Sequence, residues 1–113
     1  GDKAADKLLA DAKAVVAAGA ALLVLECVPA ELAKAVTEAV AVPVIGIGAG
    51  ADTDGQVLVM HDMLGMVHGR VPRFVHDFLT DERNNAHSIE GAFALYQQSV
   101  REGSFPTEQH QFD

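Results

Sequence analysis

The segment ALLVLECVPAEL, residues 21–32, decides the fold of this chain of 113 residues. Its first part, residues 21–26, is apolar up to Glu26 and does not alternate between apolar and polar side chains. Such runs are typical of parallel strands that are covered on both faces. Pro29 then suits the first turn of a helix, whose apolar face continues to about Val40. The segment therefore predicts a buried strand followed directly by a helix.

The same rhythm extends on both sides of this segment. Residues 2–18 carry apolar side chains at helical spacing, and Gly19 ends this predicted helix because glycine readily takes the left-handed conformation. PVIGIGAG, residues 43–50, is a second apolar run without alternation, and it begins about 22 residues after the first. Helix, strand, helix and strand in this order indicate βαβ architecture with parallel strands.

The second half of the chain gives weaker signals. QVLVMHD, residues 56–62, predicts a third strand, with a short helix as the alternative. PRFVHDFL, residues 72–79, predicts a short helix with Pro72 at its start. Three parallel strands leave at least one unpaired edge, so another chain or a further segment is expected to complete the sheet.

A longer helix is predicted near the C-terminus. It runs from about residue 88 to residue 102, with Ser88 as its N-cap and Gly103 as its end. The tail TEQHQFD, residues 107–113, is expected to be mobile.

Composition narrows the class of protein. The length fits one domain, residues 1–113, and half of the residues are apolar. A net charge of −8 argues against binding to nucleic acid or to an anionic membrane surface, which require clusters of Lys and Arg. One cysteine excludes an intrachain disulfide, and no apolar run approaches the ~20 residues of a membrane span. With no signal peptide at its start, the chain is expected to be cytoplasmic.

Glu26 is the first candidate for chemistry. In (β/α) architectures, side chains at the C-terminal ends of strands face the pocket where catalysis takes place. A carboxylate between Leu25 and Cys27 is expected to lose hydration, which makes it a stronger base. The alternatives are a carboxylate on the surface and one that caps the following helix.

Two neighbouring features have structural explanations as well. Cys27 is a potential nucleophile, but a free cysteine buried in the core is the favoured interpretation, because no partner residue lies in a local motif. GIGAGA, residues 46–51, formally matches a dinucleotide-binding fingerprint. The following DTDGQ reads as a turn and not as the required helix, so close backbone approach or tight packing is the favoured role.

His61 and Asp62 form another polar pair, at the end of the third predicted strand, where they could bind a metal or a substrate. The five histidines of the chain show no spacing that places two of them on one helical face as a zinc pair. Asp52 and Asp54 are interpreted as turn residues.

Together these segments resemble one enzyme family. LLVLECVPAELAKAVTEAVAVPVIGIGAG, then DGQVLVMHDMLGM and PRFVHDFL, are similar to the C-terminal part of ketopantoate hydroxymethyltransferases, and the resemblance extends over essentially the whole chain. It implies an α/β fold that is the C-terminal portion, about strands six to eight with flanking helices, of a (β/α)8 TIM-type barrel. The chain would then be a single partial domain, with the N-terminal part of the barrel absent.

The resemblance also implies a reaction. The family transfers a hydroxymethyl group from 5,10-methylenetetrahydrofolate to 3-methyl-2-oxobutanoate and gives 2-dehydropantoate, for pantothenate synthesis. Its general base is the glutamate of the LECVP motif, which matches Glu26. Its Mg²⁺ ligands belong to earlier strands and match no position here, so the chain alone is expected to be inactive without its N-terminal half. The resemblance further implies a homo-oligomer.

Two other functions remain open at this point. The chain could be a non-catalytic half-barrel that serves assembly, with Glu26 in a structural role. A nucleotide-binding module built on residues 46–51 is the third class.

Overall fold

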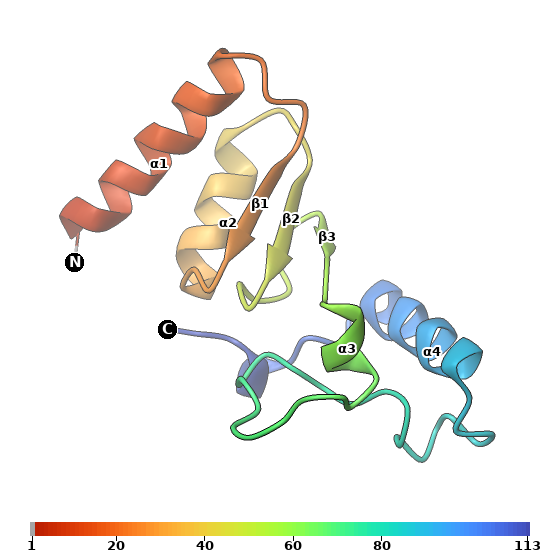
Figure 1. Cartoon of the computed structure of the whole chain (residues 1–113). Helices are drawn as coiled ribbons and strands as arrows, with labels where there is room; N and C mark the ends of the chain where they lie inside the picture. The colour runs from red at the N-terminus through yellow and green to blue at the C-terminus, as the bar shows by residue number, and fades with distance from the viewer. Residues whose placement is uncertain (1) are drawn as a thin grey trace.

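A computed structural model describes residues 2–113, as shown in Figure 1. Its elements are α1 (Asp2–Ala17), β1 (Leu23–Glu26), α2 (Ala30–Ala39), β2 (Val44–Ile47), β3 (Gly55–Gln56), α3 (Met60–Met63), α4 (Ile89–Glu102) and the 3-10 helix η1 (Glu108–His110). The helices and strands predicted for the first 50 residues are confirmed, with strand ends that are shorter than the apolar runs.

The strands form one parallel sheet in the order β1-β2-β3. The register places Leu25 opposite Gly46 and Glu26 opposite Ile47. Within residues 2–113, β1 and β3 each pair on one side only, which confirms the predicted open edge.

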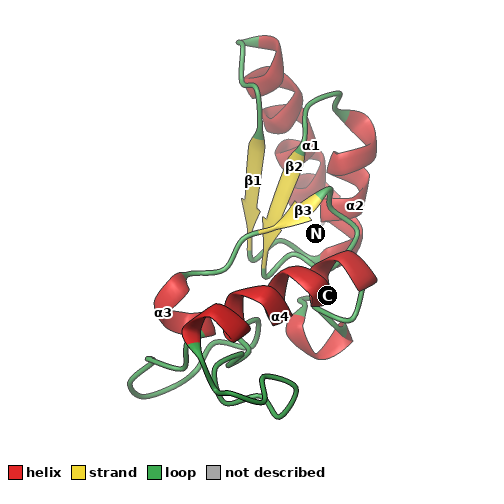
Figure 2. Cartoon of the chain, turned by 90° about the vertical axis from the view of Figure 1, so that its right-hand side faces the viewer, coloured by secondary structure: helices red, strands yellow, loops and turns green. Residues whose placement is uncertain are grey.

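One face of the sheet is covered by α1 and α2 (Figure 2). Leu25 and Val44 point to this side and are buried. The residues of this core cluster are Ala12, Leu25, Ala33, Val36, Val44 and Ala49. The sheet and these two helices therefore form a two-layer unit whose core side chains come from α1, β1, α2, β2 and the loop after β2.

The opposite face of β1 is open. Because side chains alternate along a strand, Val24 points away from the helices, and 56% of it is exposed. The prediction that β1 is covered on both faces is therefore wrong for this chain, since α1 and α2 lie on the other side and α3 lies beyond the C-terminal ends of the strands (Figure 2).

A second apolar cluster lies beyond the C-terminal ends of the strands, where α3, α4 and the connecting segments meet (Figure 1). Its buried members are Leu58, Met63, Leu64, Phe78, Ala92 and Phe105. The prediction for α4 is confirmed in detail. The Ser88 side chain accepts a hydrogen bond from the backbone N–H of Gly91, and Gly103 ends the helix at φ 78°.

Two predictions for the second half, the strand over 56–62 and the helix over 72–79, differ from the structure. Only Gln56 of residues 56–62 lies in a strand, because pairing with β2 ends after the backbone N–H of Val57 donates to Gly46. The alternative, a short helix, is realised at Met60–Met63. Residues 72–79 form turns and extended backbone, since Asp77 accepts hydrogen bonds from the N–H groups of Leu79 and Thr80 instead of allowing a helix.

The tail is also ordered against the rest of the chain. The carbonyl oxygen of Phe112 accepts a hydrogen bond from the backbone N–H of Ala30 over 2.9 Å, and Thr107 caps η1. Residues 107–113 are therefore held by these contacts, in contrast to the mobility that was expected for them.

Candidate functional site

Glu26 is the last residue of β1 and lies at the C-terminal edge of the sheet. Leu25 points toward the helices, so alternation directs Glu26 to the open face, beside Ile47 of β2. This confirms the predicted place of Glu26 at the end of a strand. The side chain is exposed, so the expected loss of hydration is not present in this chain.

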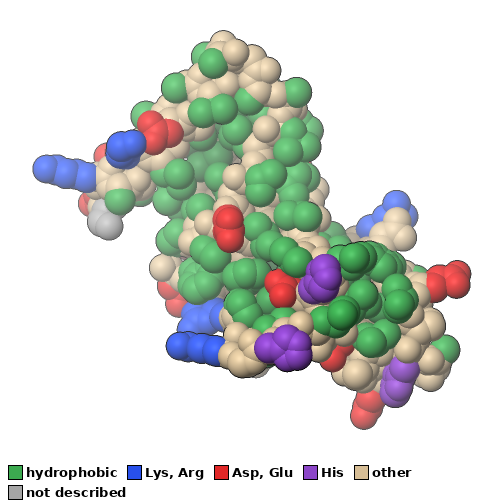
Figure 3. Space-filling view, viewed as in Figure 1, with side chains coloured by type: hydrophobic (Ala, Val, Ile, Leu, Met, Phe, Trp, Pro, Cys, Tyr) green, Lys and Arg blue, Asp and Glu red, His purple; other side chains and the backbone are tan. Residues whose placement is uncertain are grey.

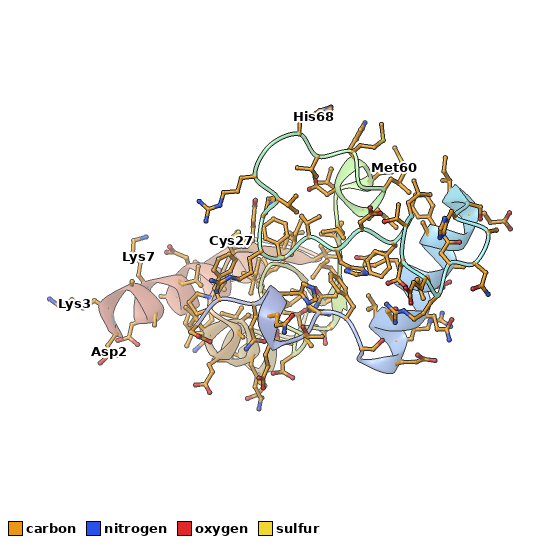
Figure 4. The ribbon with its side chains drawn as sticks, turned by 90° about the horizontal axis from the view of Figure 1, so that it is seen from below. Asp2, Lys3, Lys7, Cys27, Met60 and His68 are labelled. Carbon is orange, nitrogen blue, oxygen red and sulfur yellow. The ribbon has the colours of Figure 1, made fainter. Side chains whose placement is uncertain are left out.

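The backbone turns sharply after Glu26. Cys27 has φ 54°, a left-handed conformation, and its N–H donates to the carbonyl oxygen of Ile47 over 2.9 Å. Cys27 is exposed, so the favoured interpretation of a cysteine buried in the core is wrong. Figure 4, in which the chain is seen from below, labels Cys27 near the centre of the view.

The open face around Glu26 is apolar. Register and alternation place Val24, Ile45 and Ile47 on it, and Val57, which is 45% exposed, follows the end of β3. Figure 3 shows hydrophobic side chains gathered over the strands on this face. A carboxylate at the rim of such a surface can act as a base toward an apolar substrate that lies against it.

The glycines after β2 bring neighbouring segments close together. A Cβ atom on Gly48, at φ 65°, would lie 2.9 Å from the Phe74 ring, and one on Gly50, at φ 82°, would lie 2.7 Å from the Ala30 Cβ. No helix follows these glycines before α3, which begins at Met60. Residues 46–51 therefore lack the helix that a dinucleotide-binding fingerprint needs, and the interpretation as tight packing is confirmed.

The two aspartates of this loop differ in their roles. Asp54 Oδ2 accepts a hydrogen bond from the backbone N–H of Val44 over 2.8 Å, and the Asp54 N–H donates to the Val44 carbonyl. Val44 is fully buried, so Asp54 satisfies a main-chain group that water does not reach. Asp52 lies exposed in the same turn.

Metal ligands are not assembled in the described part of the chain. His61 and Asp62 lie in the short helix α3, and residues 2–113 contain no group of three or more His, Cys, Asp or Glu side chains placed to hold a metal ion. These residues therefore do not fit the Mg²⁺ ion that the family resemblance implies.

A charged cluster before α4 was not predicted. Asp81 accepts hydrogen bonds from Arg83 and contacts His76 Nε2, both over 2.8 Å. The hydrogen bond from the Arg83 side chain is the main cause that holds the pKa of Asp81 well below its usual range. Burial opposes this effect, and the hydrogen bond with His76 lowers the pKa further. No sequence motif predicts this cluster, because an irregular backbone brings the three residues together.

A second unpredicted group lies next to the C-terminus. Arg73 stacks over the ring of Phe112, with 5.4 Å from the guanidinium carbon to the ring centroid, and donates to the Gln111 carbonyl over 3.3 Å. A surface hollow is lined by Arg70, Val71, Pro72, Arg73 and Phe112. Arg73 and Gln111 are 38 positions apart, so no local pattern predicts their contact.

No helix in residues 2–113 has both the length and the apolar character that crossing a membrane requires.

Comparison with known proteins adds independent information. A model of the family described as ketopantoate hydroxymethyltransferase matches residues 1–108. A protein of Psychrobacter cryohalolentis called 3-methyl-2-oxobutanoate hydroxymethyltransferase is 90% identical over 112 residues, which are 99% of this chain and 42% of that protein. A protein of the same name from Escherichia coli O157:H7 is 54% identical over 112 residues and is covered to 41%. The chain thus spans about two fifths of the length of the curated relatives that it matches.

Proposed function

This chain belongs to the ketopantoate hydroxymethyltransferase family, and we propose that it supplies the C-terminal part of a barrel that transfers a hydroxymethyl group to 3-methyl-2-oxobutanoate. The donor in this proposal is 5,10-methylenetetrahydrofolate. The name of the relatives supports the acceptor and the group that is transferred. The three strands would be about strands six to eight of the (β/α)8 barrel. Parallel strands with helices on one face and an open apolar second face support this assignment.

The position of Glu26 carries the proposal. In a barrel, the face of the sheet opposite the helices is the interior, and the C-terminal ends of the strands form the floor of the active site. Glu26 meets both conditions, because it ends β1 and lies on the face opposite α1 and α2. We therefore assign it the role of general base.

The base removes the proton from C3 of the keto acid, next to the carbonyl group. The electron pair of the broken C–H bond forms the enolate, and the proton moves to the Glu26 carboxylate. The enolate carbon then forms a bond to the methylene carbon of the folate, and both C–N bonds of that carbon break. Water supplies the hydroxyl oxygen. The proton taken from C3 and the second proton of water end on N5 and N10 of the departing tetrahydrofolate. A positioned carboxylate contributes to the first step when it lies within hydrogen-bond reach of the proton.

The apolar neighbours of Glu26 would tune this base. In the chain as described, the carboxylate is exposed because the face that bears Val24 and Ile47 is open. Once other strands of the barrel cover this face, water would be excluded and the carboxylate would become more basic. The remaining part of the barrel would thus complete the site as well as the sheet.

Mg²⁺ has no assigned ligands in this proposal. When bound, such an ion would stabilise the negative charge of the enolate oxygen. The described residues offer no fitted set of ligands for it, so only the proton transfer to Glu26 is assigned to this chain.

Turnover of the complete protein tests the assignment. Glu26→Gln keeps the size of the side chain but removes the base, and we expect hydroxymethyl transfer to fall by about 10²–10⁴-fold. Glu38→Gln is the matched control, because Glu38 is an exposed carboxylate of α2 on the covered side of the sheet. Equal turnover of Glu26→Gln and Glu38→Gln would refute the catalytic role.

The open apolar face also favours a second candidate, an assembly module without catalysis. Leu22 and Val24 are about half exposed, at 49% and 56%. Their side chains offer a site for association with other apolar surfaces. In this case the mass of the native species would exceed that of a single copy, and Glu26→Gln would leave all functions unchanged. A chain that stays folded and monomeric alone would argue against any need for a completing partner.

A further inference from the structure

Two arginines lie at the C-terminal edge of the sheet without acidic partners. The chain has 16 Asp and Glu against 8 Lys and Arg, so an arginine has many potential partners. The ion pairs found in residues 2–113 nevertheless involve neither Arg70 nor Arg73. Both side chains are exposed and line the same hollow.

Arg73 is held in a defined orientation. Its guanidinium lies over the ring of Phe112 and donates one hydrogen bond to the carbonyl oxygen of Gln111. A guanidinium has five N–H groups, so most of its donors stay available for a ligand. A planar cation that is fixed in this way is suited to bind a carboxylate through two parallel hydrogen bonds.

The hollow lies at the same edge of the sheet as Glu26. Phe112 accepts a hydrogen bond from the backbone N–H of Ala30, the first residue of α2 after the loop that carries Cys27. The ring of Phe112 also packs at Gly48, directly after β2. In Figure 3, basic side chains project below the ends of the strands, in the region of the C-terminus.

We propose that Arg70 and Arg73 form a subsite for the glutamyl tail of the reduced folate. This inference rests on the proposed function, which requires a folate as donor. The tail carries two carboxylates, one for each arginine, and it projects from an aromatic ring that can lie against Phe112 and Val71. The keto acid has a single carboxylate and must lie at Glu26, so the rim is left for the longer substrate.

Direct binding tests the subsite without turnover. The ligands are tetrahydrofolate, with one glutamate, and tetrahydropteroate, which has the same ring system and no glutamate. In the complete protein, Arg73→Gln is expected to raise the Kd for tetrahydrofolate about tenfold, because one charge-assisted contact is lost. Arg70→Gln is expected to raise it by a smaller factor. Tetrahydropteroate has one carboxylate, attached directly to its benzene ring, so neither variant should raise its Kd as much as it raises the Kd for tetrahydrofolate.

Arg101→Gln is the control, since Arg101 is an exposed arginine in the last turn of α4. It should leave both dissociation constants unchanged. Arg70 makes no hydrogen bond or stacking contact within the described residues that would stabilise the fold, so Arg70→Gln provides the test if Arg73→Gln does not fold.

Three results would overturn the subsite. They are unchanged Kd values in both arginine variants, an equal rise for the ligand without a tail, and a rise in the KM for the keto acid, which would place the substrate carboxylate at the arginines. Failure of the proposed function gives a different result, namely that the unmodified complete protein transfers no hydroxymethyl group. Such a protein can still bind tetrahydrofolate through its tail, so the Kd values still test the subsite.

Discussion

The backbone N–H of Cys27 donates to the carbonyl oxygen of Ile47 over 2.9 Å, so the ladder between β1 and β2 extends one residue beyond Glu26. Glu26 is thus held between a strand and a hydrogen-bonded turn, and its backbone has little freedom. A catalytic base needs such a rigid support, because its side chain must stay within reach of one proton.

The left-handed conformation of Cys27 predicts a specific order of stability. A β-branched residue is strongly disfavoured at φ 54°, whereas glycine adopts this conformation without strain. We expect Cys27→Val to lower the free energy of unfolding of the complete protein by about 1–3 kcal/mol. Cys27→Gly should be near neutral or stabilising. Urea unfolding measures both, and equal stability of the two variants would argue against the turn described here.

Asp54 is expected to stabilise the start of β2. Asp54→Ala would leave the buried N–H of Val44 without the acceptor at 2.8 Å, which costs about 1–3 kcal/mol. Asp54→Asn keeps an acceptor oxygen and should cost less. The comparison of the two variants by urea unfolding separates the hydrogen bond from other effects of the loop. If Ala and Asn cost the same, the hydrogen bond to Val44 is not the cause.

The cluster of Asp81, Arg83 and His76 predicts a dependence of stability on pH. The pKa of Asp81 is lower in the folded chain than its ordinary value of 3.8, so its ionised form stabilises the folded state above about pH 4. This contribution is lost as the pH falls below about 4 toward the folded pKa.

Asp81→Asn should therefore be less stable than the unmodified protein at pH 7, and the difference should shrink below about pH 4. Denaturant unfolding at a series of pH values measures it. A difference that stays constant down to pH 2 would contradict the assigned ion pairs.

The helix, strand, helix and strand of the first 50 residues could be predicted from the sequence because their signals are local and redundant. Residues 21–25 and 43–50 are apolar or glycine at consecutive positions, with Gly19 and Pro29 near the ends of the first run and Pro43 at the start of the second. Prediction from the sequence failed where tertiary contacts decide the backbone. Phe78 is fully buried, and its backbone N–H donates to the Met63 carbonyl oxygen. The packing of Phe78 in the second apolar cluster therefore determines the backbone of residues 72–79, and this backbone is not helical.

In the candidate site too, local features could be predicted from the sequence and features that depend on tertiary contacts could not. The place of Glu26 follows from the strand pattern, and its proposed role came from the family resemblance. Its exposure and that of Cys27 could not be predicted, because they depend on what covers the open face. The contact of Arg73 with Phe112 joins residues far apart in the chain, and no periodicity reveals such a pair.

Exchange of the C3 proton of 3-methyl-2-oxobutanoate with solvent deuterium, followed by NMR in the complete protein, tests the central claim most directly. This exchange needs the base and the keto acid, and it can be measured without folate. We expect Glu26→Gln to lower the exchange rate by about 10²–10⁴-fold, while Glu38→Gln exchanges at the unmodified rate. Exchange in Glu26→Gln at the rate of the unmodified protein would contradict the assignment of Glu26 as the general base.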